Sequence, residues 1–449
     1  MHDLRRQALE SGKTVSRKAR SRTASAASSK ANSAVNSRAN SRANSRNPSR
    51  HGSDEDEGFL SDGTAWSTNS IDDILNNEDV DLPPDAWKAE LHSIIEQIVD
   101  RKRSSTEGRA DSLNVYTHVL MAKYAKDEIE SRMNGILPAI LRSIKAETSE
   151  RETVTALRAL TVTIVTLDSD DIYDSVCDLL KRTVSDSESI QTKIGALHAL
   201  GTATFFGGAS EEEAEEIMAF LLEIVESDGL SVGAHDQGGV VVAALEEWGL
   251  LATEIEDMEE ASEAAMEAFV EQLQSSDSSV QIAAGENIAL LYEKSYTPRE
   301  HDEDLSDDED SDDEGYVKNG DKMVKRYNVY RRQDQLIHTL EELAKISTRK
   351  VSKKDRKTLH SSFTDILNSV EKPTRGPKYS TAVNDETGRT YGAGRMKVRI
   401  NRNVEVRIDK WWKLQRLCAL RRVLQGGFAT QYDANEAVSR TLPFTVSRG

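Results

Sequence analysis

Apolar residues recur every three or four positions from Pro83 to about Ser295, which is the period of amphipathic α-helices. The first stripe holds Leu91, Ile94 and Ile98; it follows two prolines, with Asp85 as a candidate N-cap. Polar links, such as those at 168–171 and 275–279, separate the later stripes. The pattern predicts about ten helices of roughly 12 to 20 residues and no strands in this region.

The spacing of these helices indicates a repeat. Helix pairs recur about every 40 residues, which is the period of armadillo and HEAT repeats. Small residues mark this spacing at 158–161, 195–201 and 283–291, and we expect neighbouring helices to approach closely there. Residues 83–298 are therefore predicted to form an armadillo/HEAT-like helical solenoid, whose groove suits an elongated partner. We expect His198 and Cys177 to lie in or near its core, because neither has a second ligand or base at a useful spacing.

Residues 1–82 have a different composition. The motif Asn-Ser-Arg-Ala repeats every four residues between positions 36 and 46, with almost no apolar side chains. Such a segment cannot bury enough surface to offset the entropy of ordering it. Residues 1–82 are therefore predicted to be a disordered tail, rich in Ser and Arg at first and acidic from Ser53. Residues 1–50 could contact nucleic acid or a nuclear import receptor, or serve only as a soluble low-complexity tail.

The net charge of −19 is the sum of three unlike parts. Residues 1–50 carry a charge of +10, residues 51–316 carry −45, and residues 317–449 carry +16. Salt screens charges from one another beyond about 8–10 Å, so each part can have its own partner. The acidic middle should repel phosphate backbones, whereas the two basic ends could attract them.

Residues 299–316 are predicted to be an acidic linker. Eleven of the fifteen residues at 300–314 are Asp or Glu, and like charges at this density keep a chain extended. Ser306 and Ser311 each precede three acidic residues, as Ser53 does. A kinase that prefers acidic flanks could therefore phosphorylate all three serines. The linker could also fold back onto the basic C-terminal region.

Helices are predicted to resume over residues 317–372, followed by a second linker at 373–394. Leu336, Leu340 and Leu343 form one apolar stripe, and Ser352 and Pro373 mark the two ends of the next helix. Between the stripes lies a basic cluster that could be a nuclear localisation signal, a phosphate-contacting surface or the solvated side of a helix. Its residues are Arg349, Lys350, Lys353, Lys354, Arg356 and Lys357.

The most informative segment is a predicted basic α+β subdomain at 395–440. Apolar and mostly cationic residues alternate over 396–400 and again over 404–408, which predicts a hairpin with one apolar and one cationic face. A basic amphipathic helix follows from Lys410. The region is predicted to contact RNA or the ribosome through Arg395, Lys397, Arg399, Arg402, Arg407, Lys410, Trp411, Lys413, Arg416, Arg421 and Arg422. Alternatively, Trp411 and Trp412 seat the subdomain on the preceding helices, or the helix lies on a membrane surface.

Several of these segments together resemble the interferon-related developmental regulator family. The resemblance rests on Gly52-Ser-Asp-Glu-Asp56, the helical body and Ser352-Lys-Lys-Asp-Arg-Lys-Thr-Leu-His-Ser-Ser-Phe363. The tail Tyr391-Gly-Ala-Gly-Arg-Met-Lys-Val-Arg-Ile400, with Asp409-Lys-Trp-Trp412, resembles fungal members, and the resemblance covers roughly residues 50–440.

The resemblance implies an armadillo-like N-terminal domain, a small C-terminal domain and no enzymatic activity. It also implies roles in nuclear transcriptional co-regulation and in ribosome binding with translational repression. The paired tryptophans and the strongly basic hairpin depart from the animal pattern, so partner residues of animal members do not transfer to this sequence.

The sequence lacks the common motifs of catalysis and cofactor binding: a P-loop, GxGxxG after a strand, GxSxG and HExxH. Cys177 and Cys418 form no CxxC pair, which excludes a cysteine zinc site and fits a reducing compartment. The longest apolar run, at 240–245, is far shorter than the ~20 residues that span a bilayer. The polar N-terminus has no apolar segment typical of a secretory signal. We therefore expect a non-enzymatic protein of the cytoplasm, the nucleus or both, with no cofactor, metal, small-molecule substrate or membrane association.

Two functions remain. In the first, the basic C-terminal region binds RNA or the ribosome and modulates translation, with an affinity that falls steeply with salt. In the second, the acidic solenoid is a nuclear scaffold for transcriptional co-regulation and binds basic protein segments. The first function explains the basic hairpin and helix more directly.

Overall fold

The structure is a computed structural model, and it describes residues 85–101, 104–299, 323–345, 353–378, 396–401 and 404–444. For residues 353–357 it describes the backbone alone. Several predictions fall outside the described residues: the tail at 1–82, nearly all of the acidic linker, the three candidate phosphorylation sites and part of the basic residues. The single residues concerned are Ser53, Ser306, Ser311, Arg349, Lys350, Arg395 and Arg402.

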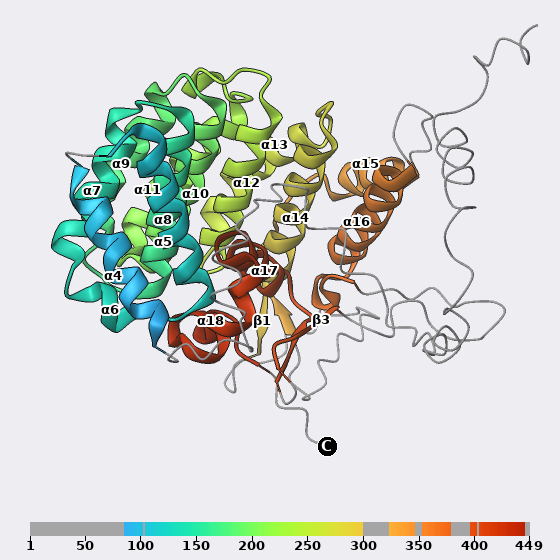
Figure 1. Cartoon of the computed structure of the whole chain (residues 1–449). Helices are drawn as coiled ribbons and strands as arrows, with labels where there is room; N and C mark the ends of the chain where they lie inside the picture. The colour runs from blue at the N-terminus through green and yellow to red at the C-terminus, as the bar shows by residue number, and fades with distance from the viewer. Residues whose placement is uncertain are drawn as a thin grey trace, which may run out of the picture. The chain divides into compact units, whose positions relative to one another are not determined.

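Helices make up most of the described chain (Figure 1). The described residues between Ala86 and Lys294 form eleven α-helices and one 3-10 helix. These are α4 (Ala86–Val99), α5 (Thr106–Ala122), α6 (Lys126–Glu130), α7 (Met133–Ala146), α8 (Glu150–Leu167), α9 (Tyr173–Asp186), α10 (Ile190–Phe206), α11 (Glu211–Glu226), η2 (Leu230–Val232), α12 (Gly238–Ala252), α13 (Glu259–Gln272) and α14 (Ser278–Lys294). Further along lie α15 (Gln333–Lys345), α16 (Lys353–Glu371) and η3 (Pro373–Arg375).

These helices stack in two layers. In the inner layer α5, α8, α10, α12 and α14 each pack against the next, and α16 packs against α14. In the outer layer α4, α7, α9, α11 and α13 each pair with one inner helix. The core lies between the layers; Trp248 of α12, for example, packs edge-on against Phe269 of α13, with ring centroids 4.8 Å apart. This arrangement confirms the predicted all-α, armadillo/HEAT-like helical solenoid.

The starts of the inner helices follow the predicted period. The N-cap residues of α8, α10, α12 and α14 are separated by 40, 48 and 40 residues; they are Ser149, Ser189, Gln237 and Asp277. Ser149 and Ser189 each accept a hydrogen bond from the backbone N–H three residues later, which fixes where α8 and α10 begin. The longer interval accommodates the loop that contains η2.

Small residues let the inner helices approach closely, as predicted. A Cβ atom at Gly195 of α10 would lie 3.2 Å from Leu157 Cδ1 of α8. A Cβ atom at Gly201 would lie only 2.8 Å from Glu247 Cβ of α12, which is closer than real Cβ contacts. His198 between them is half-buried and Cys177 of α9 is buried, so both lie in or near the core as expected.

The described residues also form two short antiparallel strand pairs. The pair β3 (Met396–Arg399) and β4 (Glu405–Ile408) is the predicted hairpin, in which Val398 faces Val406. The pair β1 (Tyr296–Pro298) and β2 (Met323–Lys325) was not predicted, because three-residue strands this far apart give no periodic signal.

The C-terminal helices lie across the inner layer. They are α17 (Trp411–Leu424), η4 (Gln425–Gly427), α18 (Phe428–Ala434) and α19 (Glu436–Thr441). α17 packs against α14, α12 and α8, α18 packs against α5, and α19 packs against α8 (Figure 1). The Gln431 amide donates to the Leu120 carbonyl oxygen and the Asn435 amide donates to that of Val165, both near inner-helix ends. The chain thus folds back along the C-terminal halves of its own inner helices.

Candidate nucleic-acid interface

The predicted RNA-binding residues separate into two groups, one of which is used inside the protein. In α17, Arg416 donates to the hydroxyl and carbonyl oxygens of Thr253, at 2.9 and 3.1 Å, and pairs with Glu254. Arg422 pairs with Glu246 at 2.6 Å and with the fully buried Glu247. These two cations are neutralised by acidic residues of the solenoid.

The charged group around Arg422 joins three helices. Glu247 of α12 also contacts His198 of α10, with Nδ1 and Oε1 2.8 Å apart. Burial lowers the pKa of Arg422, but the neighbouring Glu247 and Glu246 charges outweigh burial and raise it above the ordinary value. The basic helix and the acidic solenoid, each predicted to bind an outside partner, therefore bind each other here.

Trp411 is also used inside the protein. Its side chain is 2% exposed, and the indole Nε1–H donates to Ser369 Oγ of α16 at 2.7 Å. Its backbone N–H and that of Trp412 both donate to the Glu293 carboxylate of α14, at 2.9 and 3.2 Å. Glu293 thus caps the first turn of α17, where backbone N–H groups have no partner within the helix. Burial raises the pKa of Glu293, although the Lys410 charge and these two N–H groups oppose the shift.

Trp412 is half-buried, and two cationic side chains make cation–π contacts with its ring. The Arg416 guanidinium carbon lies 4.9 Å and Lys413 Nζ lies 5.5 Å from its ring centroid. Lys413 Nζ is also 2.7 Å from Asp409. Of the predicted helix residues, Lys413 and Arg416 thus have partners within the chain, and Arg421 is half-buried.

The second group of predicted residues lies on the surface of the β3–β4 hairpin. Its apolar face, with Val398, Val406 and Ile408, is buried against the body, as the alternation predicted. On the other face Lys397 and Arg399 are exposed, while Arg407 is half-buried. Lys397 is 55% exposed and pairs with Glu405 at 2.7 Å. This face therefore presents three cations with one acidic side chain among them.

A second pair of surface cations lies on β2 and just after it. Lys325 and Arg326 are exposed, and the backbone N–H of Arg326 donates to the Ser295 carbonyl oxygen at the end of α14. Glu293, two residues before Ser295, binds the first turn of α17, and α17 begins directly after β4. The β1–β2 pair and the β3–β4 pair therefore both lie near the C-terminal end of α14. Sequence reasoning did not single out Lys325 and Arg326, because only the pairing of β1 with β2 places them here.

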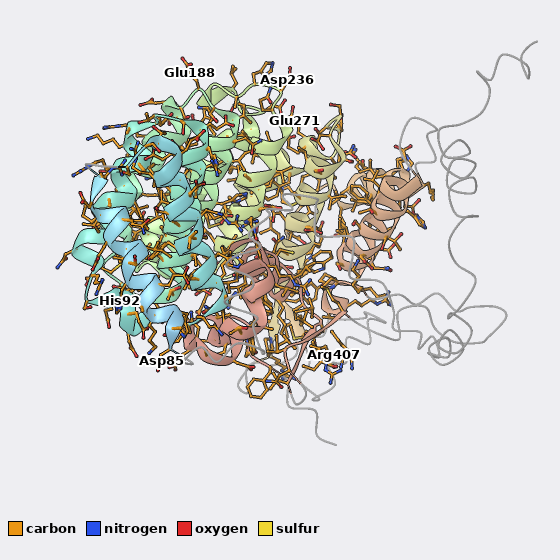
Figure 2. All side chains as sticks on the ribbon, in the orientation of Figure 1. Asp85, His92, Glu188, Asp236, Glu271 and Arg407 are labelled. Atoms are coloured by element: carbon orange, nitrogen blue, oxygen red, sulfur yellow. The ribbon has the colours of Figure 1, made fainter. Side chains whose placement is uncertain are left out.

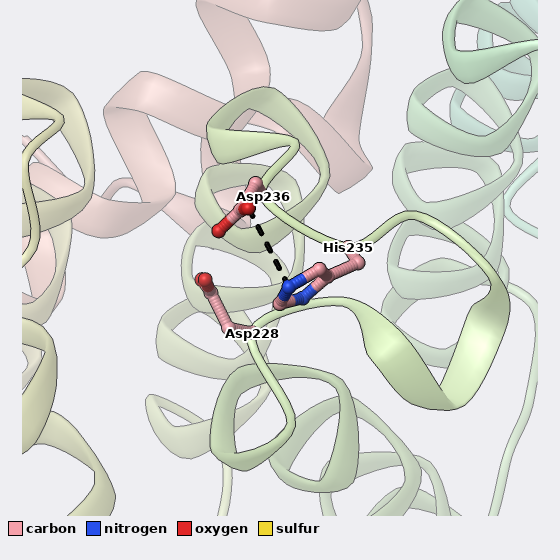
Figure 3. Close-up of side chains that lie close together, drawn as sticks. All are labelled: Asp228, His235 and Asp236. Carbon is pink, nitrogen blue, oxygen red and sulfur yellow. Dashed lines mark ion pairs between the residues drawn. The ribbon is translucent and has the colours of Figure 1, made fainter.

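Three labelled acidic residues, Glu188, Asp236 and Glu271, lie along one edge of the solenoid in Figure 2, and we call this edge the acidic edge. Arg407 is labelled at the opposite edge, as is Asp85. The acidic edge includes Asp228, His235 and Asp236, whose polar atoms lie within 4.8 Å of one another (Figure 3). His235 Nε2 is 3.4 Å from Asp236 Oδ2, and both side chains are largely exposed. No further described feature indicates a ligand at this cluster.

The remaining predicted sites are only partly described. Residues 353–357 of the basic cluster form the first turn of α16, without described side chains. Both cysteines are free thiols, and burial raises the pKa of Cys418 to about 12. None of the described helices is both long enough and apolar enough to cross a membrane.

Comparisons with known proteins find relatives for much of this chain. The sequence model of the interferon-related developmental regulator family matches residues 60–371. An uncharacterized protein of Schizosaccharomyces pombe is 27% identical over 348 residues, which cover 77% of this chain and 72% of the relative. Among solved structures, an engineered protein matches with a TM-score of 0.36 and 13% identity, over 63% of this chain and 97% of its own.

Proposed function

We propose that this chain, which belongs to the interferon-related developmental regulator family, binds RNA on the ribosome through the cationic face of its β3–β4 hairpin and thereby modulates translation. The observation that carries the proposal is the set of three cations on one face of the hairpin, the exposed Lys397 and Arg399 and the half-buried Arg407, on a protein whose body is strongly acidic. Lys325 and Arg326 extend this set at the same end of α14. The protein acts in this proposal as a non-enzymatic binding protein.

Electrostatics supports the hairpin rather than α17 as the RNA-binding element. The α17 cations Arg416 and Arg422 already have carboxylate partners, so moving them to phosphate would leave those carboxylates unpaired. The hairpin cations can bind phosphate without leaving a carboxylate unpaired, apart from Lys397, which pairs with Glu405. Each phosphate contact releases condensed counterions, so the affinity should fall steeply with salt.

Sedimentation of the tagged full-length chain from a cell lysate tests the proposal. One variant carries Lys397→Glu, Arg399→Glu and Arg407→Glu. The matched control carries Arg142→Glu, Lys145→Glu and Arg182→Glu, which make the same charge change at exposed positions of α7 and α9. We expect the normal chain and the control to travel with ribosomal particles at low salt, and the hairpin variant to stay at the top of the gradient.

The salt dependence of binding to purified RNA adds a second readout. The plot of log affinity against log salt should lose about 0.7 to 0.9 units of slope for each phosphate contact that the hairpin variant removes. If both triple variants sediment alike, or the slope is unchanged, the hairpin is not the RNA-binding surface.

A second function, the binding of basic protein segments as a nuclear scaffold for transcriptional co-regulation, is supported by the outer helices α11 and α13. The sequence has no Lys or Arg between Lys193 and Lys294. Over this stretch α11 and α13 hold many exposed carboxylates, among them Glu211, Glu212, Glu215, Glu216, Glu263, Glu267 and Glu271. A lysine-rich peptide should bind this face, and changing Glu211, Glu212, Glu215 and Glu216 to Lys should abolish the binding at physiological salt.

A further inference from the structure

Among the described residues, the C-terminal helices bind the inner helices at their middle and later turns. Their hydrogen bonds and ion pairs reach the later turns of the inner helices, for example Asn287 and Glu293 of α14 and Val165 of α8. The earlier turns carry a half-buried apolar residue at equivalent positions of four successive helices. We call these four residues the inner strip: Val154 of α8, Ile194 of α10, Val242 of α12 and Ile282 of α14.

The inner strip follows the register of the repeat. Its members are 40, 48 and 40 residues apart, the same intervals that separate the N-caps of these helices. Because the helices pack side by side in this order, the four side chains form a row across the layer. A row of apolar side chains at least partly open to solvent is typical of a protein-binding surface.

Ionisable side chains line the inner strip one turn later on each helix. They are Arg158, His198, Glu246 and Glu286, and all four are half-buried. Glu246 and His198 are engaged through α17, by way of Arg422 and Glu247. The two end residues, Arg158 and Glu286, have no ion-pair partner within the described residues, although they have opposite charge.

Each end residue lies in surroundings that favour an opposite charge from outside. The Arg158 guanidinium has only Met121 Sδ, at 3.9 Å, as a described partner, and its Nε is buried without a hydrogen bond. Burial lowers the pKa of Arg158. Burial and the nearby Glu246 charge raise the pKa of Glu286 to about 7, although Lys378 opposes the shift. A carboxylate would therefore stabilise Arg158, and a cation would stabilise ionised Glu286.

We propose that the inner strip binds an extended segment of a partner protein, with an acidic side chain at Arg158, apolar side chains on the strip and a basic side chain at Glu286. Packed helices lie about 8–10 Å apart, so the three steps from α8 to α14 span about 25–30 Å. An extended chain covers this span with about eight or nine residues. The segment thus carries its acidic and basic residues about eight or nine positions apart, with apolar residues at about every third position between them. This proposal does not depend on RNA binding by the hairpin.

Peptide selection on the full-length chain tests the proposal. A phage library of random dodecapeptides is selected on the normal chain and counter-selected on Val242→Asp. A matched control, Val270→Asp, changes a half-buried valine of the outer helix α13. We expect enriched peptides with the predicted order of charges that bind the normal chain and the control but not Val242→Asp, while all three chains keep the same circular dichroism spectrum.

A charge exchange makes the test specific. The best enriched peptide is synthesised, and its affinity is measured by fluorescence anisotropy. Arg158→Glu and Glu286→Lys should each weaken binding about tenfold or more. A peptide with its acidic and basic residues exchanged should regain binding to the double variant.

Any of the following outcomes of the peptide experiments would overturn the proposal: no enrichment, enriched peptides without this polarity, or peptides that bind the double variant and the normal chain equally. Self-association of the full-length chain that Val242→Asp abolishes would also overturn it, because the occupant would then be a second copy of this chain.

Discussion

Gly201 of α10 lies directly against a buried charge of α12. A side chain there would lie against Glu247, which is fully buried and bound by Arg422. We expect Gly201→Ala to lower the free energy of unfolding by about 1–3 kcal/mol, because the methyl group must push α10 and α12 apart. Urea unfolding measures this change.

Gly195 provides the matched control for Gly201, because it lies on the same helix. An added methyl group would meet the Leu157 side chain alone, with Cδ1 at 3.2 Å and Cβ at an ordinary contact distance of 3.6 Å. We expect Gly195→Ala to be neutral or to stabilise by up to ~1 kcal/mol, since alanine favours helix. Equal losses in both variants would show that close approach at Gly201 has no special importance.

Glu286 makes the stability of the protein depend on pH. Its pKa is raised to about 7 from an ordinary 4.5, first by burial and then by the Glu246 charge, so the folded state holds this proton more tightly than the unfolded state. The contribution of Glu286 to the free energy of unfolding is therefore complete below about pH 4.5 and is lost as the pH rises through 7. Burial raises the pKa of Asp365 to about 6, which acts in the same direction.

Glu286→Gln should remove this dependence on pH. Between pH 5 and pH 8 we expect the normal chain to lose on the order of 1 kcal/mol more unfolding free energy than the variant, because glutamine has no proton to release. Urea unfolding at pH 5, 6, 7 and 8 measures the difference. If the free energy of unfolding changes with pH equally in the two chains, the pKa of Glu286 is not raised in the folded state.

At the scale of elements, the start of α17 depends on one carboxylate from another helix. Glu293 of α14 accepts hydrogen bonds from two backbone N–H groups in the first turn of α17. Glu293→Ala would leave the buried N–H group of Trp411 and the part-buried one of Trp412 without this acceptor, and we expect the free energy of unfolding to fall by about 2–4 kcal/mol. Hydrogen exchange should accelerate at the first amides of α17. The control Glu271→Ala, at an exposed position of α13, should change stability by no more than about 0.5 kcal/mol.

Local patterns predicted the elements but not all of their partners. The helices and the β3–β4 hairpin follow from apolar spacing, and Ser149 and Ser189 mark helix starts because a cap is a local interaction. The sequence left the placement of α17 open between the preceding helices, RNA and a membrane surface, since its apolar face fits any complementary surface and its cations suit phosphate as well as carboxylate. The structure seats Trp411 and Trp412 on the preceding helices, which was one of these alternatives. The burial of Trp411 depends on Ser369 and Glu293, which lie 42 and 118 residues away in the sequence.

At the scale of the molecule, part of the charge segregation along the sequence is resolved by folding. The acidic region contributes Glu246, Glu247 and Glu254, and the basic C-terminal region contributes Arg416 and Arg422 to pair with them. These pairs join positions more than 160 residues apart. The C-terminal helices are therefore part of the solenoid's charge balance, and the hairpin and the outer helices are among the described elements that keep charges at the surface.

This charge balance predicts that the solenoid does not fold normally without its C-terminal helices. A chain that ends at Asp409 would lack α17 to α19, which would uncover part of the inner layer. The buried Glu247 would lose Arg422 and keep only His198, and the buried Glu293 would lose the two N–H groups that it caps. Unpaired buried charges cost several kcal/mol, so we expect the midpoint of thermal unfolding to fall by about 10 °C or more. A chain that ends at Phe444 is the control and should unfold like the full-length chain. If the shorter chain unfolds at the same temperature and with the same cooperativity, residues 411–442 are an independent subdomain, and their contacts with the inner layer do not stabilise it.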